Sequence, residues 1–230
     1  MLEDIVLWRP LYYVSIAMYI SALILLPFSF TWSIITIFAL ISLWSRIPGS
    51  ILYIFRQLAL NDFFTFIVAV NIGGFVGGLF GVFSFLFSRI FLHDEEFLTD
   101  IYESIAIFSG ALLVPLIVDY VGSVNITSFL IYEGILYFIY YSIVLLFHRD
   151  WISEELVELP FGIFFDFFMN GFFIVAFGSI LSDLMSKGIT SGWPLFIFTS
   201  IILFFIVLAK IEKLLAKIPF FKSFKRKSEE

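Results

Sequence analysis

The chain has 230 residues, of which 61% are hydrophobic and 14% are charged, and its formal net charge is −6. A soluble globular domain is about 45–50% apolar and about 25% charged, so a water-soluble fold of this composition would lack polar side chains to cover its surface. The composition therefore predicts an all-α bundle that crosses a lipid bilayer several times. The chain has no cysteine and only two histidines, which excludes disulfides and disfavours a catalytic triad or a histidine-rich metal site.

Seven apolar segments are candidates for crossing the membrane, because about 20 apolar residues span a hydrocarbon core about 30 Å thick. In chain order they are residues 11–30, 31–44, 63–91, 104–121, 126–147, 161–184 and 193–215. The second segment is short enough to be a partial span, so we expect six or seven crossings. They form one transmembrane bundle over residues 1–216, followed by a basic tail over residues 217–230.

The basic residues near the C-terminus predict the orientation of the bundle. They are Lys210, Lys213, Lys217, Lys222, Lys225, Arg226 and Lys227. Because Lys and Arg are enriched on the cytoplasmic side of membrane proteins, we expect a multi-pass cell-membrane protein with a cytoplasmic C-terminus. No basic groove is apparent in the rest of the chain, so nucleic-acid binding is not expected.

Small residues recur along segment 63–91. The glycines form two neighbouring rows with a spacing of four, namely Gly73, Gly77 and Gly81, and beside them Gly74 and Gly78. Residues four apart share one face of a helix, and a face without side chains lets another backbone approach closely. The rows predict tight helix packing within the chain, with a homo-oligomer, a membrane-protein partner or a close-backbone ligand site as the alternatives.

The same segment is long for one straight crossing. It is therefore expected either to tilt strongly or to break between Asn71 and Gly74. A break at that depth would expose backbone groups that can line a cavity.

Ionisable side chains inside apolar spans are costly and commonly mark function. Glu133 lies within segment 126–147, and Asp166 lies within segment 161–184, one helical turn before Asn170. With a rise of about 1.5 Å per residue, Glu133 and Asn170 come to similar depths in the membrane. The predicted substrate- or ion-binding residues are Glu133, Asp166, Asn170, Asn71 and Tyr137. The carboxyl groups of such a pocket are either protonated, in contact with water, or paired with a cation.

Residues 71–88, which carry both glycine rows, resemble the glycine-rich span of the substrate-binding subunits of energy-coupling-factor transporters. Membrane proteins of the cell-shape MreD type are similar there. The overall length and the half-dozen crowded spans belong to the same resemblance, while a seventh span departs from the six-helix pattern. The resemblance implies that Gly73, Gly77 and Gly81 contact a coupling partner.

These features predict a membrane-embedded solute-binding or transport subunit, for a cation or a small cationic solute, that works with partner proteins. The alternative is a non-catalytic structural or assembly subunit of a membrane complex. The sequence has no nucleotide-binding loop, so the energy for transport would come from a partner or an ion gradient. An enzyme is not expected, because no nucleophile constellation or paired-aspartate metal motif is present, and no cofactor is expected either.

Overall fold

A computed structural model describes residues 9–46, 60–91, 97–149, 159–160 and 163–187 of the chain. Every regular element in these ranges is a helix, which confirms the all-α prediction for this part of the chain. Six helices come first: α2 (Arg9–Leu25), α3 (Phe30–Ser45), α5 (Asn61–Ile72), α6 (Gly74–Phe91), α7 (Phe97–Val121) and α8 (Ile126–Phe147). They form three antiparallel hairpins in series, α2–α3, α5–α6 and α7–α8.

The first hairpin turns at Pro27, close to the boundary between the predicted segments 11–30 and 31–44. The Ser33 hydroxyl of α3 donates a hydrogen bond of 2.7 Å to the Ala22 carbonyl of α2. Further along, the Trp44 indole N–H donates to the Ser15 hydroxyl over 2.9 Å. These two contacts fix the antiparallel register of α2 and α3 near both ends of the pair.

The second hairpin replaces the single long span that residues 63–91 were expected to form. The chain breaks at Gly73, whose φ of 128° is accessible at low cost only to glycine, and it reverses direction there. Gly77 then packs against Ala69, and Gly81 packs against Thr65, so the two helices pair outward from Gly73. Of the two expectations for this segment, the break is confirmed.

The third hairpin turns at Gly122, which has a φ of 82°. The Asn125 side chain then caps α8: its oxygen accepts from the Ser128 backbone N–H, and the Ser128 hydroxyl accepts from the Asn125 N–H. Such a reciprocal capping box satisfies two backbone donors that the first turn of a helix leaves unpaired. The start and end of α8 coincide with those of the predicted segment 126–147.

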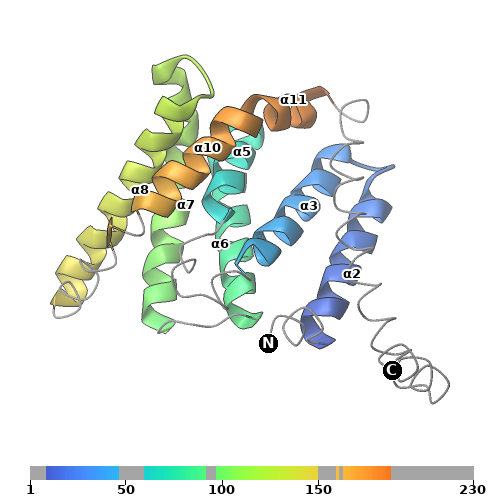
Figure 1. The fold of residues 1–230 in the computed structure, drawn as a ribbon, viewed down its shortest axis with the longest axis horizontal. Coiled ribbons are helices and arrows are strands. Elements are labelled where there is room, and N and C mark those ends of the chain that lie inside the picture. The colour runs from blue at the N-terminus through green and yellow to red at the C-terminus, as the bar shows by residue number, and fades with distance from the viewer. Residues whose placement is uncertain (1–8, 47–59, 92–96, 150–158, 161–162, 188–230) are drawn as a thin grey trace, which may run out of the picture.

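The turns of the first and third hairpins both lie at the top of Figure 1. We call this end of the bundle the turn end and the opposite end, where Arg46 and Arg89 lie, the arginine end. Gly74, beside the turn of the middle hairpin, faces Ala111 and Leu112 of α7. That position is nine residues before the end of α7 at Val121, which corresponds to about 13 Å of helix. The middle hairpin is therefore shorter than its neighbour and turns inside the bundle.

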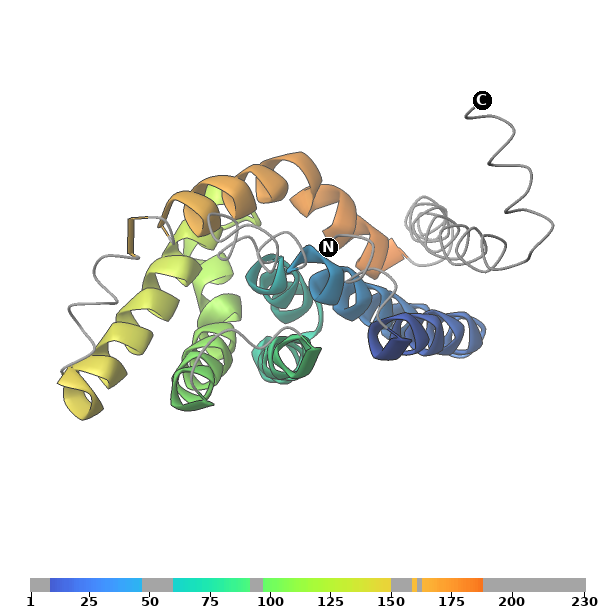
Figure 2. The same cartoon turned by 60° about the horizontal axis from the view of Figure 1, so that its bottom comes forward.

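A further helical segment, residues 163–187, crosses one side of the three hairpins (Figure 2). It consists of η3 (Ile163–Asn170), α10 (Gly171–Phe173), η4 (Ile174–Gly178) and α11 (Ser179–Lys187), where η3 and η4 are π-helical. Its first half contacts α8, and α11 contacts α5 and α3. We call this segment the strap. It corresponds to the predicted segment 161–184.

The exterior of the bundle is apolar. Three helices are long and apolar enough to cross a membrane, namely α7, α8 and the strap residues Phe167–Ser186, and four shorter apolar helices accompany them. Large hydrophobic side chains point outward, such as Phe75, Leu116 and Phe138, with 60%, 65% and 74% of their surface exposed. Such a surface suits hydrocarbon rather than water, and it indicates a multi-pass membrane protein. The predicted span 193–215 and the basic tail lie outside the described residues.

Candidate functional site

Glu133 is completely buried in the middle of α8, with 0% of its surface exposed. Phe129 and Tyr137 lie one turn before and one turn after it, on the same face of the helix. A carboxyl group in such surroundings is costly unless polar groups or a bound cation compensate for its lost hydration. The structure therefore agrees with the sequence in placing an ionisable group inside the bundle.

Asn170 is a buried polar residue of the strap, which packs against α8. Tyr137 of α8 contacts Phe167 of the strap, with ring centroids 5.6 Å apart, and Gly171 lies against the side chain of Ile126. Glu133 lies between these two contacts on α8, and Asn170 lies between them on the strap. Asn170 is only 2% exposed, so each of these two neighbouring helices carries a buried polar side chain.

Two tyrosine rings continue this site toward the arginine end. The rings of Tyr137 and Tyr141 are stacked, with centroids 6.1 Å apart, and Tyr140 meets Tyr141 edge to face at 5.2 Å. The faces of aromatic rings attract cations. The third hairpin and the strap thus carry a buried carboxyl group, a buried amide and aromatic rings.

The remaining predicted site residues have different positions. Asp166 belongs to η3, one turn before Asn170, and its side chain lies outside the described part of the structure. Asn71 lies beside the turn at Gly73, where its side-chain oxygen accepts a 3.0 Å hydrogen bond from the Ser182 hydroxyl. Ser182 follows Asn170 by twelve residues, or about 18 Å of helix. The structure therefore separates Asn71 from Glu133. The hydrogen bond between Asn71 and Ser182 connects the strap to the middle hairpin instead.

The glycine rows are covered by helices of the same chain. A Cβ atom on Gly77 would come within 2.4 Å of the Ala69 Cβ of α5, and one on Gly81 within 2.6 Å of the Thr65 hydroxyl. In the second row, a Cβ on Gly74 would lie 2.6 Å from the Ala111 carbonyl oxygen of α7, and one on Gly78 would lie 2.7 Å from the Phe108 ring. This arrangement favours packing within the chain, the first of the interpretations of the rows.

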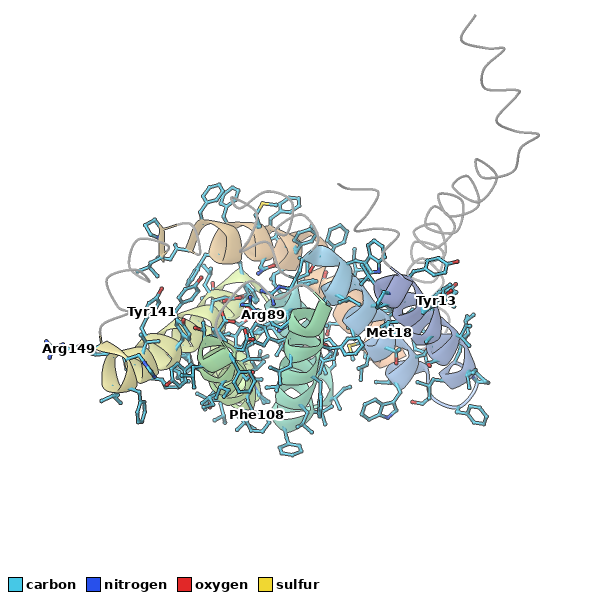
Figure 3. The ribbon with its side chains drawn as sticks, turned by 90° about the horizontal axis from the view of Figure 1, so that it is seen from below. Tyr13, Met18, Arg89, Phe108, Tyr141 and Arg149 are labelled. Atoms are coloured by element: carbon cyan, nitrogen blue, oxygen red, sulfur yellow. The ribbon has the colours of Figure 1, made fainter. Side chains whose placement is uncertain are left out.

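Sequence reasoning missed a buried ionic group at the arginine end. Arg89, near the end of the predicted segment 63–91, was given no role, but its side chain is only 3% exposed and reaches α7 (Figure 3). Its Nε lies 3.0 Å from an Asp100 carboxylate oxygen, and its Nη2 donates a 3.0 Å hydrogen bond to Glu103. The signal was present in the sequence, because Arg89 lies near the end of segment 63–91, and the acidic residues Asp100 and Glu103 lie shortly before segment 104–121.

Arg46 joins the same end of the bundle from α3. Its Nη1 donates a 3.2 Å hydrogen bond to the Ser88 hydroxyl, and its guanidinium carbon lies 5.3 Å from the centroid of the Phe85 ring. Arg89 lies over the same ring at 5.0 Å. Among the described residues, no three His, Cys, Asp or Glu side chains are close enough together to hold a metal ion.

No family model matches this chain, and no curated protein sequence and no solved structure is significantly similar to it. The resemblance of residues 71–88 to energy-coupling-factor and MreD-type proteins therefore stays a prediction. The functional argument rests on the geometry of the chain itself.

Proposed function

We propose that this protein is a membrane-embedded solute-binding or transport subunit, and that it binds a cation or a small cationic solute beside Glu133. The observation that carries the proposal is the complete burial of Glu133 in the middle of α8, the helix against which the strap packs. A cation bound there would be held by a carboxylate, an amide oxygen and the tyrosine rings. Asp166 would add a second carboxyl group from the strap.

The strap supplies the means to change this site. It is π-helical before and after the single turn of α10, and π-helical segments are rare and frequently occur at functional sites. Converting a π-helical turn to an α-helical one rotates the residues on one side of it relative to the other. In the proposal, such a change moves Asn170 relative to Glu133 and opens the site.

The alternative function is a structural or assembly subunit, which would use the glycine rows to contact a partner. These rows contact α5 and α7 of the same chain, so they leave no small-residue face for a partner at Gly77 or Gly78. We place the protein in the cell membrane with its C-terminus in the cytoplasm. A transport subunit there would need a partner or an ion gradient as its source of energy.

The test is binding and uptake by the purified protein. Binding of monovalent cations and small cationic amines would be followed by calorimetry in detergent, and uptake would be measured in liposomes. Wild type is expected to bind one of these solutes, and Glu133→Gln is expected to weaken binding at least tenfold, since a charge-assisted contact is worth about 1.5–3 kcal/mol.

A matched control is Asp119→Asn, which removes an exposed carboxyl group of α7 and is expected to leave binding unchanged. Unaltered binding in Glu133→Gln would contradict the proposed site. The absence of binding of any cation to wild type would contradict the proposed function and would favour the structural subunit. Binding without uptake would agree with a subunit that requires its partner.

A further inference from the structure

Three buried side-chain oxygen atoms have no hydrogen-bonding partner in the part of the chain that the structure describes. They are Ser42 Oγ on α3, and Asn61 Oδ1 and Thr65 Oγ1 on α5. These residues are 1%, 5% and 0% exposed. Buried polar atoms are nearly always paired, so three unpaired oxygens in one region require an explanation, and a bound ion is one of the usual ones.

Contacts between α3 and α5 place Ser42 opposite Asn61. The rings of Phe38 and Phe64 stack with centroids 4.5 Å apart, and at the other end the Ser45 hydroxyl accepts a 3.0 Å hydrogen bond from the Leu60 N–H. Ser42 lies between Phe38 and Ser45 on the same face of α3, four residues from the first and three from the second. In the antiparallel pair, the residue that faces this position is Asn61.

Thr65 comes to the same place because both α5 residues face Gly81 of α6. The Asn61 amide nitrogen donates a 3.3 Å hydrogen bond to the Gly81 carbonyl, which leaves Asn61 Oδ1 as the unpaired atom. Thr65 Oγ1 would be 2.6 Å from a Cβ atom on Gly81. The three oxygens therefore gather where α3, α5 and α6 meet, one turn into α5 from the arginine end.

The charges around this junction define the kind of ligand that would fit. Asp62 follows Asn61, and its carboxylate oxygen lies 3.5 Å from the Asn61 amide nitrogen. Arg46, which bonds Ser88 of α6, also acts electrostatically on this carboxyl group. One acidic and one basic group therefore lie beside the junction, a pairing that favours an ion of low charge. Hydroxyl and amide oxygens are hard ligands, which prefer hard cations such as the alkali metals.

We propose that Ser42 Oγ, Asn61 Oδ1 and Thr65 Oγ1 form a binding site for a small monovalent cation, such as sodium, between α3, α5 and α6. The site is separate from Glu133, which lies on α8. It does not depend on the proposed function. A cation there would join the first two hairpins, because its ligands come from both.

The test compares thermal unfolding of the full-length purified protein in sodium, lithium, potassium and choline chloride at equal ionic strength. The tryptophan fluorescence of the chain reports unfolding. An alkali cation is expected to raise Tm in a saturable manner, on the order of 5–10 °C at a hundred times its Kd, whereas choline is too large to enter. Ser42→Ala and Thr65→Val, each of which removes one ligand oxygen, are expected to abolish or greatly weaken this rise.

Thr36→Val is the matched control, because the Thr36 hydroxyl bonds the Trp32 carbonyl within α3 and is not part of the junction. It is expected to keep the cation response of wild type. The same Tm in sodium, lithium, potassium and choline chloride for the wild-type protein would overturn the proposal. So would a cation response that survives in both Ser42→Ala and Thr65→Val, since the ion would then bind elsewhere. Glu133→Gln is expected to keep the cation response of wild type, because Glu133 is not part of the junction.

Discussion

At Gly73 the backbone has φ 128° and ψ 152°, and a Cβ atom there would meet no atom within 4 Å. At Gly77 the backbone is ordinary α-helix, but a Cβ atom would lie 2.4 Å from the Ala69 Cβ. The first glycine is thus required by backbone conformation and the second by lack of space. Both requirements belong to the same hairpin, and each has a different physical cause.

Both glycines can be tested by substitution with alanine. Gly73→Ala is expected to lower the free energy of unfolding by about 1–3 kcal/mol, because its backbone conformation strains any other residue. Gly77→Ala is expected to cost a similar amount, about 1–3 kcal/mol, because α5 and α6 must move apart. Thermal unfolding in detergent would measure both losses.

The control for this pair is Gly134→Ala on α8, where a Cβ atom would meet nothing within 4 Å and φ is not positive. Alanine there is expected to leave stability unchanged or to raise it by up to about 1 kcal/mol, through its higher helix propensity. Equal stability of Gly77→Ala and Gly134→Ala would refute the close approach of α5 and α6.

At the scale of the helices, α6 and α7 are joined by charge at the arginine end and by glycine packing nearer the turn end. Arg89 in the last turn of α6 meets Asp100 in the first turn of α7, so each charge also complements the dipole of its own helix. The Asp100 side chain is 4% exposed and that of Glu103 is 28% exposed. The two carboxylates therefore contribute unequally to the pairing.

Asp100→Asn is expected to lower the free energy of unfolding by about 3–5 kcal/mol, because it leaves the buried Arg89 without its more buried counter-charge. Glu103→Gln is expected to cost less than about 1 kcal/mol, because solvent screens a partly exposed pair. Denaturation of the two variants side by side measures the difference. If Glu103→Gln were the more damaging change, the assignment of Asp100 as the main partner of Arg89 would be wrong.

Hydropathy was sufficient to predict most of the helices. The segment 126–147 has the bounds of α8, and segment 31–44 differs from α3 by one residue at each end. These successes are expected, since an apolar run in a bilayer must be helical. Helix α7 begins at Phe97, earlier than the predicted residue 104, because its first turns carry Asp100 and Glu103, which hydropathy excludes.

Other features depend on tertiary contacts that no local pattern contains. The spacing of the glycines predicted a close helix neighbour but not that α5 itself, folded back at Gly73, would be that neighbour. Similarly, depth along the membrane placed Glu133 level with Asn170, but it could not separate Asn71, whose bond to Ser182 depends on the path of the strap. The burial of Arg89 was missed because charge was counted along the chain and not between helices.

At the scale of the whole molecule, the three hairpins all turn toward the same end and the strap lies across them (Figures 1 and 2). Glu133 lies in the third hairpin, which the strap contacts. The proposed monovalent-cation site lies between the first and second hairpins, nearer the arginine end.

Both sites depend on an arrangement in which the hairpin turns lie on the same side of the bilayer. Cysteine labelling measures directly on which side each turn lies. The chain has no cysteine, so single cysteines can be introduced at Phe28 and Ser123 in two of the turns, and at Arg149 beyond the opposite end of α8. In sealed vesicles, an impermeant maleimide is expected to label Phe28→Cys and Ser123→Cys from one side and Arg149→Cys from the other, which the basic tail predicts to be the cytoplasmic side. Labelling of Phe28→Cys and Ser123→Cys from opposite sides, or of Ser123→Cys and Arg149→Cys from the same side, would contradict this arrangement.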